Sequence, residues 1–451
     1  MGVMTDVALE SQIGRWRGFV ERHRAISTSD ADEMEDHLRG RISDLVASGL
    51  TDDEAFLVAV KRMGSVDAIS REFAREHSER LWKQLVLVPA EQGERTRVPR
   101  RELVVVLALA VCAGAVLEVA LRVGLDAGAF ARNAAVLVLP FLASYFAWKR
   151  RVTVGVAAVL MGAFVATASA VNAFPLAPGG ATEIIVAIHA PIVLWFVVGL
   201  AYVGGEWRSH RRRMDFIRFT GEWVVYLTLL ALGGGVLIGL TVGAFTALGT
   251  DMEWVIEEWV LPFGVPGAVI VAAWLVEAKQ GVVENIAPVL TRVFTPLTIV
   301  MLLVLLVAFA LDGNLVDVDR TLLILMDLIL VVVLGLLLYS ISARDPLDPP
   351  DLFDRLQLIL VASALAVDLV MLTAMLTRIA EFGVSPNKAV ALGLNLVLFA
   401  NLAWSGRVQI GFLRGRRRFE AVELWQTRYL PVFGGWAALV VLVVPPLFDF
   451  V

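Results

Sequence analysis

The chain has 451 residues, of which 58% are hydrophobic and 18% are charged, and its net charge at pH 7 is −5. An ordinary soluble domain is about 45–50% apolar and about 25% charged, so the composition excludes a soluble globular protein as well as a disordered or collagen-like chain. The single cysteine, Cys112, excludes an intrachain disulfide framework and a cysteine-based zinc site. Because each bilayer crossing takes about 20 apolar residues, the apolar part of the chain predicts roughly eleven transmembrane helices.

Charged residues are concentrated in the N-terminal quarter of the chain, where 34 of them precede Glu102. We therefore expect a water-soluble domain over residues 1–88, a polar linker over 89–101 and a polytopic membrane domain over 102–451. The first residues lack the apolar core of a signal peptide. The N-terminal domain is thus expected to remain in the cytoplasm.

The N-terminal domain has a helical period, and turn residues mark the ends of its helices. Gly49 and Gly64 are suited to end helices in the left-handed conformation. Thr51 and Glu54 have the spacing of a capping box, in which Thr51 accepts from the third amide and Glu54 reaches back to the cap amide. The expected helices cover about residues 7–24, 30–49, 52–64 and 65–87, and they pack around Leu38, Ile42, Leu45, Ala55, Val58, Ile69 and Phe73.

These residues carry a resemblance to a known family. Gly49-Leu50-Thr51, Glu54-Ala55, Ala59 and Met63-Gly64, followed by Ile69 and Phe73, resemble the short helical domain called the permease prefix or HAAS-type domain, which precedes bacterial permeases and other multi-pass proteins. The resemblance covers residues 28–80 and implies a cytoplasmic interaction domain with a protein partner. The same G-x-T-x-x-E pattern is also an ordinary way to join two helices.

Eleven apolar runs follow the linker, and basic residues gather in alternate loops between them. Because Lys and Arg are enriched in cytoplasmic loops, the alternation predicts a cytoplasmic N-terminus and an external C-terminus. The resemblance to the prefix domain of bacterial permeases implies that the membrane is a bacterial inner membrane. The expected spans are 102–123, 130–148, 152–172, 183–204, 218–247, 258–277, 294–312, 321–342, 354–379, 387–404 and 430–448. The bases of the predicted cytoplasmic loops include Lys149, Arg150, Arg151, Arg208, Arg211, Arg212, Arg213, Arg344, Arg355, Arg407, Arg414, Arg416, Arg417, Arg418 and Arg428.

Loop lengths and missing motifs argue against an external domain, a nucleotide at a P-loop and nucleic acid. None of the outer loops is longer than about fifteen residues, which leaves no room for the external domain of a typical export permease. The chain has no G-x-x-x-x-G-K-[ST] motif, so no nucleotide is expected at a P-loop. The basic runs at 211–213 and 416–418 lack interleaved aromatic residues, so no nucleic acid is expected, and they can instead contact anionic lipid.

A second resemblance lies in the C-terminal half. Asp368 stands in an apolar helix, followed by the stretch RIAEFGVSPNK at 378–388 and a helix ending near Trp404. This arrangement is similar to the C-terminal part of a bacterial polytopic family of unknown function, whose typical stretch is R-I-x-E-Y-G-[LI]-T-x-x-R. Phe382 and Ser385 replace the Tyr and Thr, and Lys388 stands near the expected Arg. The likeness covers residues 290–405 and implies no particular activity.

Few ionisable residues lie within the predicted spans. A charge at mid-bilayer costs at least about 2.5–3.5 kcal/mol, so such residues are functional candidates. Asp368 is the deepest, Asp327 lies about one and a half turns into its helix, and Glu118 and Arg122 are i,i+4 neighbours that can pair. All four can alternatively serve as interhelical contacts, as we expect of Asn395 and Asn401.

His189 and a polar cluster near residue 380 are two further candidates for a functional site, and each also has a structural interpretation. His189 lies two residues before Pro191, whose missing amide frees a carbonyl that the imidazole can engage. One histidine makes no metal site, and no metal or other cofactor is expected. The cluster Arg378, Glu381, Asn387 and Lys388 lies at an outer helix–loop–helix, where it forms either a rigid hairpin or a site for a solute or lipid headgroup.

Two classes of function remain open. The first is a regulatory or scaffold membrane protein whose cytoplasmic domain binds a partner. The second is a secondary transporter with Asp368 and Asp327 as proton- or substrate-linked carboxylates. An enzyme is less favoured, because paired carboxylates, H-E-x-x-H and a Ser/His/Asp constellation are lacking. The two classes are discriminated by whether the carboxylates face a hydrated cavity: Asp368 sealed among apolar side chains with a hydrogen-bond partner favours the regulatory role.

Overall fold

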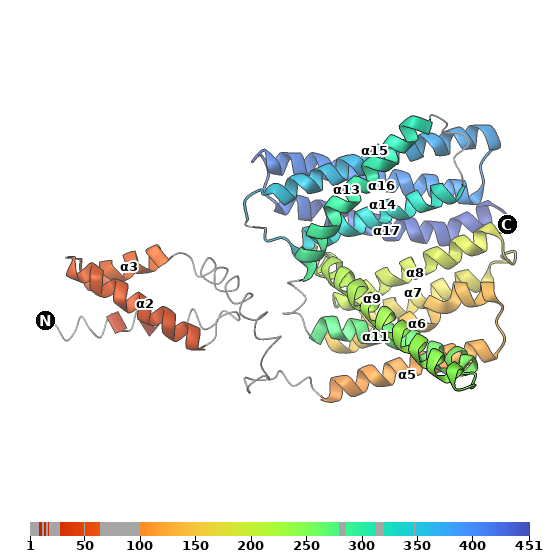
Figure 1. Cartoon of the computed structure of the whole chain (residues 1–451), viewed down its shortest axis with the longest axis horizontal. Coiled ribbons are helices and arrows are strands. Elements are labelled where there is room, and N and C mark those ends of the chain that lie inside the picture. The colour runs from red at the N-terminus through yellow and green to blue at the C-terminus, as the bar shows by residue number, and fades with distance from the viewer. Residues whose placement is uncertain are drawn as a thin grey trace. The chain divides into compact units, whose positions relative to one another are not determined.

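The computed structural model describes residues 9–10, 13–14, 17, 28–48, 50–63, 100–278, 286–312, 320–346 and 348–451. The described residues form helices and connecting turns, with no strand among them, and Figure 1 shows their course. The chain divides into two compact units, residues 1–97 and 98–451. The all-helical fold class predicted from the sequence is confirmed.

The N-terminal unit contains helices α2 (Thr28–Ala47) and α3 (Asp52–Met63), which pack against each other. Its apolar core is formed by Ile13, Leu38, Ile42, Ala55 and Ala59. Three of these, Leu38, Ile42 and Ala55, were expected in the core. The expected helix over 65–87, with Ile69 and Phe73, lies outside the described residues. Residues 89–99 of the expected linker also lie outside them.

The start of α3 differs in detail from the predicted capping box. The Glu54 carboxylate accepts from the Thr51 amide at 3.1 Å, as expected. The Thr51 hydroxyl donates to the same carboxylate at 2.8 Å and does not act as the acceptor that the sequence suggested. These two bonds stabilise the charged carboxylate and hold the pKa of Glu54 below its usual range.

Ion pairs join the segments of the N-terminal unit. Arg39 pairs with Glu35 at 2.8 Å and with Glu10 at 2.5 Å, and Arg17 pairs with Glu35 at 2.7 Å. The hydrogen bonds from Arg39 and then Arg17 lower the pKa of Glu35. Glu35 is the most enclosed of these four side chains, with 15% of its surface exposed.

Acid is expected to destabilise the N-terminal unit. The pKa of Glu35 is lower in the folded than in the unfolded state, where it is near 4.5, so ionised Glu35 adds to the free energy of unfolding. This contribution is present above the unfolded pKa and is lost as pH falls through the lower folded pKa. The melting temperature of residues 1–88, followed by circular dichroism, should fall below about pH 4.5. Glu35→Gln should lower the melting temperature at pH 7 and make it less dependent on pH. A non-cooperative melt at pH 7 would contradict an independently folded domain.

The second unit contains eleven helices that are long and apolar enough to cross a membrane, counted over the described residues. The protein is therefore a multi-pass membrane protein in contact with lipid, and the expected number of spans is confirmed. The helices are α5 (Arg100–Arg122), α6 (Ala127–Arg150), α7 (Val154–Ala173), α8 (Ala181–Tyr202), α9 (His210–Ala247), α10 to α11 (Glu253–Ala278, with a π-helical turn at Ile256–Val260), α13 (Ile286–Asp312), α14 (Arg320–Ala343), α15 (Leu352–Phe382), α16 (Pro386–Leu413) and α17 (Glu420–Leu447).

Several helices are longer than the apolar runs that predicted them. Helix α9 begins at His210 where the apolar run begins near 218, and α17 begins at Glu420 where the run begins near 430. Hydropathy marks only the part of a helix that suits lipid. The polar extensions remain helical because they pack against other polar helix ends, as His210 does with Thr427 at 3.2 Å.

Contacts between helix ends bring the predicted basic loops to one end of the second unit. Lys149, at the end of α6, donates to Glu102 at the start of α5, and Arg150 pairs with Glu277 near the end of α11. At the opposite end, Arg132 of α6 pairs with Glu183 of α8. We name the two ends the basic end and the opposite end.

The side of the membrane that each end faces remains a prediction. A cysteine introduced at 208–213 or 414–418, in the basic end, should react with a membrane-impermeant thiol reagent only from the cytoplasmic side. One introduced at 312–319 should react from outside. Cys112→Ala provides the background for both sets. Labelling of both sets from the same side would contradict the alternating topology.

Aromatic side chains fill the core where α6, α8 and α9 meet. Tyr202 stacks on Phe219 with ring centroids 4.5 Å apart, and Phe146 meets both rings edge-on. Gly221 lies so close to Tyr339 of α14 that a Cβ atom would stand 2.3 Å from the ring. This close approach packs α9 against α14, between the two groups of helices in Figure 1.

Candidate functional site

Asp368 lies in the middle of α15 and is completely buried. Its neighbours along the helix, Val367 and Met371, are fully buried in the main apolar core. Neither carboxylate oxygen has a hydrogen-bond partner among the described residues. The sequence therefore located a deeply buried acid correctly, but the structure gives it no donor to stabilise a negative charge.

Asp327, on α14, is held by Asn395 of α16. The Asn395 amide nitrogen donates to an Asp327 carboxylate oxygen at 2.9 Å and to the Ala391 carbonyl at 3.0 Å. The Asn395 side-chain oxygen is buried without a partner in the described part of the chain. Asp327 also lies within electrostatic range of Asp368. Within this set of two acids and Asn395, on three helices, the hydrogen bond joins Asp327 and Asn395, and we call the set the carboxylate cluster.

A second polar network joins α16 to α17. The buried Asn401 donates to Gln426 at 3.0 Å, and Gln426 donates to Ser405 at 2.6 Å. These residues are completely buried. Asn395 and Asn401 therefore both bond to a neighbouring helix, as the sequence predicted. This network shows how the membrane unit satisfies polar groups that serve packing.

The carboxylate cluster constrains the charge state of Asp368. An ionised carboxylate buried without a donor is too costly to persist, so Asp368 must carry a proton or hold a cation. The two unpaired oxygens of Asp368 are acceptors, and they suit either a proton or a small cation. Among the described residues, no group of three or more His, Cys, Asp or Glu side chains converges as in a protein metal site.

A cavity of about 300 Å³ lies at the basic end, where α6, α8, α9 and α11 meet. Phe219 and Val276 provide apolar wall, while the polar lining is contributed mainly by one face of α9. The polar residues are Arg150, Tyr202, Arg212, Asp215, Arg218 and Glu222. We call this the charged cavity.

Hydrogen bonds fix two of the arginines that line the charged cavity. Arg150 donates to the Tyr202 carbonyl at 3.0 Å and to Glu277 at 2.8 Å, and its guanidinium lies over the Tyr202 ring. Arg218 donates through Nε to the Ser342 carbonyl of α14 at 2.9 Å and through Nη2 to the same oxygen. These bonds hold the Arg150 guanidinium against α8 and α11 and the Arg218 guanidinium against α14.

Sequence reasoning missed the charged cavity. Arg150 was interpreted as a topology determinant and Arg212 as a topology determinant that can contact anionic lipid, and Asp215, Arg218 and Glu222 were not considered. One signal was present in the sequence: positions 215, 218 and 222 are spaced by three and four residues, which places their charges on one face of a helix.

The remaining predicted intramembrane residues have local partners. Glu118 and Arg122 pair at 2.5 Å, and Arg122 lies over the ring of Trp259. The His189 Nδ1 atom lies 2.9 Å from the Ile185 carbonyl. The imidazole thus engages the carbonyl one turn back and not the one freed by Pro191, because the i−4 oxygen is within reach of its own helix face.

The predicted outer cluster, Arg378, Glu381, Asn387 and Lys388, lies around the tight turn between α15 and α16. Lys388 donates to the carbonyl oxygens of Gly383 at 2.8 Å and Arg378 at 3.3 Å. Glu381 is exposed, and Asn387 is in the first turn of α16. Lys388 therefore closes the helical hairpin. The sequence had allowed two alternatives for this cluster, a rigid hairpin or a ligand site, and these bonds match the hairpin.

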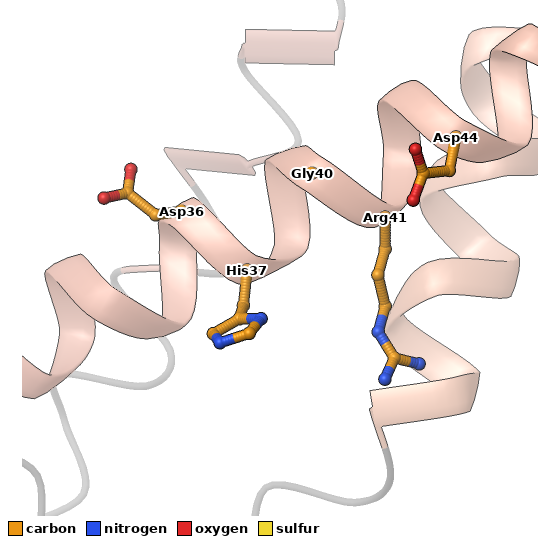
Figure 2. Close-up of a pocket in the computed structure, with 5 residues that line it drawn as sticks. All are labelled: Asp36, His37, Gly40, Arg41 and Asp44. Atoms are coloured by element: carbon orange, nitrogen blue, oxygen red, sulfur yellow. The ribbon is translucent and has the colours of Figure 1, made fainter.

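The N-terminal unit carries a separate hollow of about 360 Å³ along one helix, α2. Figure 2 shows His37 and Arg41 extending in the same direction from consecutive turns, with Asp36 directed away from them. These side chains are exposed. The hollow is a charged surface of the predicted interaction domain and encloses no buried reactive group.

Comparison of the chain with protein-family models, with curated proteins and with solved structures finds no match in any of the three. The carboxylate cluster and the charged cavity are therefore the features that bear on function.

Proposed function

We propose that this multi-pass membrane protein is a secondary transporter in which Asp368 carries the coupling proton. The supporting observation is that Asp368 is completely buried while both of its carboxylate oxygens lack a partner. A carboxyl group in this position can release its proton only when a change of conformation gives the resulting carboxylate water, a hydrogen-bond donor or another cation. Proton binding and release at Asp368 then provide a way to couple ion movement to a conformational change.

The other buried polar groups argue against a purely structural Asp368. Asn401, Gln426 and Ser405 bond to one another across α16 and α17, as interhelical contacts do. Asp327 likewise accepts a bond from Asn395. Asp368 has the burial of these residues without a bond, as the amide of Gln409 on α16 also has, but Asp368 is an acid and can take up or release a proton.

The test uses the full chain reconstituted in liposomes on a solid-supported membrane. A pH jump should produce a transient charge movement that empty liposomes lack, because protons enter and leave a site within the bilayer. If sodium or potassium steps at constant pH produce the transient instead, the coupling ion is a metal cation. Absence of any charge movement would contradict the proposal.

A regulatory protein is the second candidate, and the N-terminal unit favours it. This unit closes its own apolar core with Ile13, Leu38 and Ala55, and it carries a charged surface on α2. Its resemblance to the permease prefix domain supports a role in binding a cytoplasmic protein through residues 28–80. In this second proposal the protein lies in the bacterial inner membrane with its N-terminus inside, and the pH jump moves no charge.

A further inference from the structure

The charged cavity is separate from the carboxylate cluster and has chemistry of its own. Its lining comes from α6, α8, α9 and α11, whereas Asp368, Asp327 and Asn395 lie on α14, α15 and α16. Glu222, on its wall, is only 5% exposed. A proton carrier on α15 does not require this cavity, so its charges need another explanation.

Charges of both signs alternate along the face of α9 that lines the cavity. Arg212, Asp215, Arg218 and Glu222 follow one another at intervals of three, three and four residues. Arg150 adds a further guanidinium from α6. The wall therefore presents both hydrogen-bond donors with positive charge and acceptors with negative charge, within one small volume.

Internal contacts leave part of this charge available. Arg218 bonds to the Ser342 carbonyl, a neutral group, so that bond does not neutralise its charge. Among the described residues, Arg212 forms one ion pair, a solvent-exposed contact of 3.3 Å with Glu206. Asp215 forms no ion pair within 4.0 Å in the part of the chain that the structure describes. A ligand that carries both charges can replace the missing partners.

We infer that the charged cavity binds a small zwitterion, a primary ammonium group joined by a short linker to a phosphate or carboxylate. Arg212 and Arg218 bind the anionic group, because guanidinium matches such oxygens through paired N–H donors. Asp215 accepts from the ammonium group, and the negative charge of the nearby Glu222 adds to the attraction. A volume of about 300 Å³ is at the lower limit for ligand pockets, which suits a headgroup or a small solute.

Two sources can supply this chemistry: a soluble metabolite, or the ethanolamine phosphate headgroup of a membrane lipid. The lipid is a possible source because the cavity lies where several membrane helices end. A quaternary ammonium headgroup has the same charges but no N–H donor for Asp215. Phosphoethanolamine and phosphocholine are therefore a matched pair of probes.

Binding is measured by calorimetry with the full-length protein in detergent. Phosphoethanolamine should bind at least tenfold more tightly than phosphocholine, inorganic phosphate or ethanolamine. Asp215→Asn and Arg218→Gln should each weaken that binding at least tenfold. Arg211→Gln, an exposed neighbour outside the cavity, and Asp368→Asn should leave it unchanged, which separates this inference from the proposed transport role.

The same protein in nanodiscs identifies the source of the ligand. If phosphatidylethanolamine discs abolish phosphoethanolamine binding that phosphatidylcholine discs preserve, the ligand is the lipid; if both preserve it, the ligand is a solute. Equal affinity for phosphate alone would overturn the inference in favour of a simple anion site. Unchanged binding in Asp215→Asn, or no binding by the wild type, would also overturn it. If Arg218→Gln does not fold, Asp215→Asn alone decides.

Discussion

Asp368→Asn is expected to reduce the pH-driven charge movement of the reconstituted protein at least tenfold while its amount in the membrane stays normal. Asparagine has nearly the size of aspartate but does not titrate. Because neither Asp368 oxygen accepts a hydrogen bond within the described structure, the substitution breaks none. The folded protein should therefore tolerate the change, and only the exchange of a proton should be lost. Charge movement is compared at equal protein content in the liposomes.

Two variants control this experiment. Glu381→Gln removes a carboxylate from the same helix at an exposed position, and it should preserve the full charge movement. Asp327→Asn changes the electrostatic neighbour of Asp368 and should shift the pH dependence without abolishing the signal. Full charge movement in Asp368→Asn across pH 5–8 would rule out Asp368 as the carrier. A loss of abundance alone would leave Asp368 as a packing residue.

Glu277→Ala is expected to cause the largest loss of stability, about 3–5 kcal/mol, because it breaks a buried ion pair. The Glu277 side chain is 2% exposed and accepts from Arg150 at 2.8 Å and Lys149 at 3.2 Å. Lys149 in turn bonds Glu102 at 2.7 Å, so Glu277 joins α5, α6 and α11. Its removal leaves two cations at the basic end with one carboxylate. Unfolding by SDS in mixed micelles measures the change.

The matched control for Glu277→Ala is Glu206→Ala. Glu206 pairs with Arg212 at 3.3 Å, but both side chains are more than half exposed. An exposed pair contributes about 0–1 kcal/mol, so this variant should unfold almost like the wild type. Equal, small effects of both substitutions would show that the ion pairs of Glu277 with Lys149 and Arg150 are not important for stability.

The number of spans could be predicted from the sequence because lipid selects long apolar runs, whatever the tertiary structure. The helix ends could not. At α9 residues 210–217, five of which are charged or polar, continue the helix because Arg213, Met214, Phe216 and Ile217 are buried and His210 reaches Thr427, a contact over more than two hundred residues of sequence. Hydropathy contains no information about such partners.

The candidate sites show the same division. Asp368 was recognised because a lone acid in an apolar run is costly wherever it lies. The bond between Asp327 and Asn395 was not predicted, because the two residues are 68 positions apart and their pairing depends on helix packing. The cavity was missed because the charges of α9 have the composition of an ordinary cytoplasmic loop. Only the approach of α6 and α11 encloses them.

The length of α9 makes the protein sensitive to the thickness of its membrane. Residues 223–247 carry no charge and extend for about 37 Å, which exceeds the roughly 30 Å of a typical hydrocarbon core. A helix of this length fits by tilting, and Figure 1 shows α9 running obliquely across its neighbours. Residues 212–222, which line the charged cavity, belong to the same continuous helix, so a change of tilt that is not absorbed by bending at Gly233, Gly234 and Gly235 also moves these residues. Acyl-chain length should therefore change the affinity of the charged cavity even when headgroup and pH are constant.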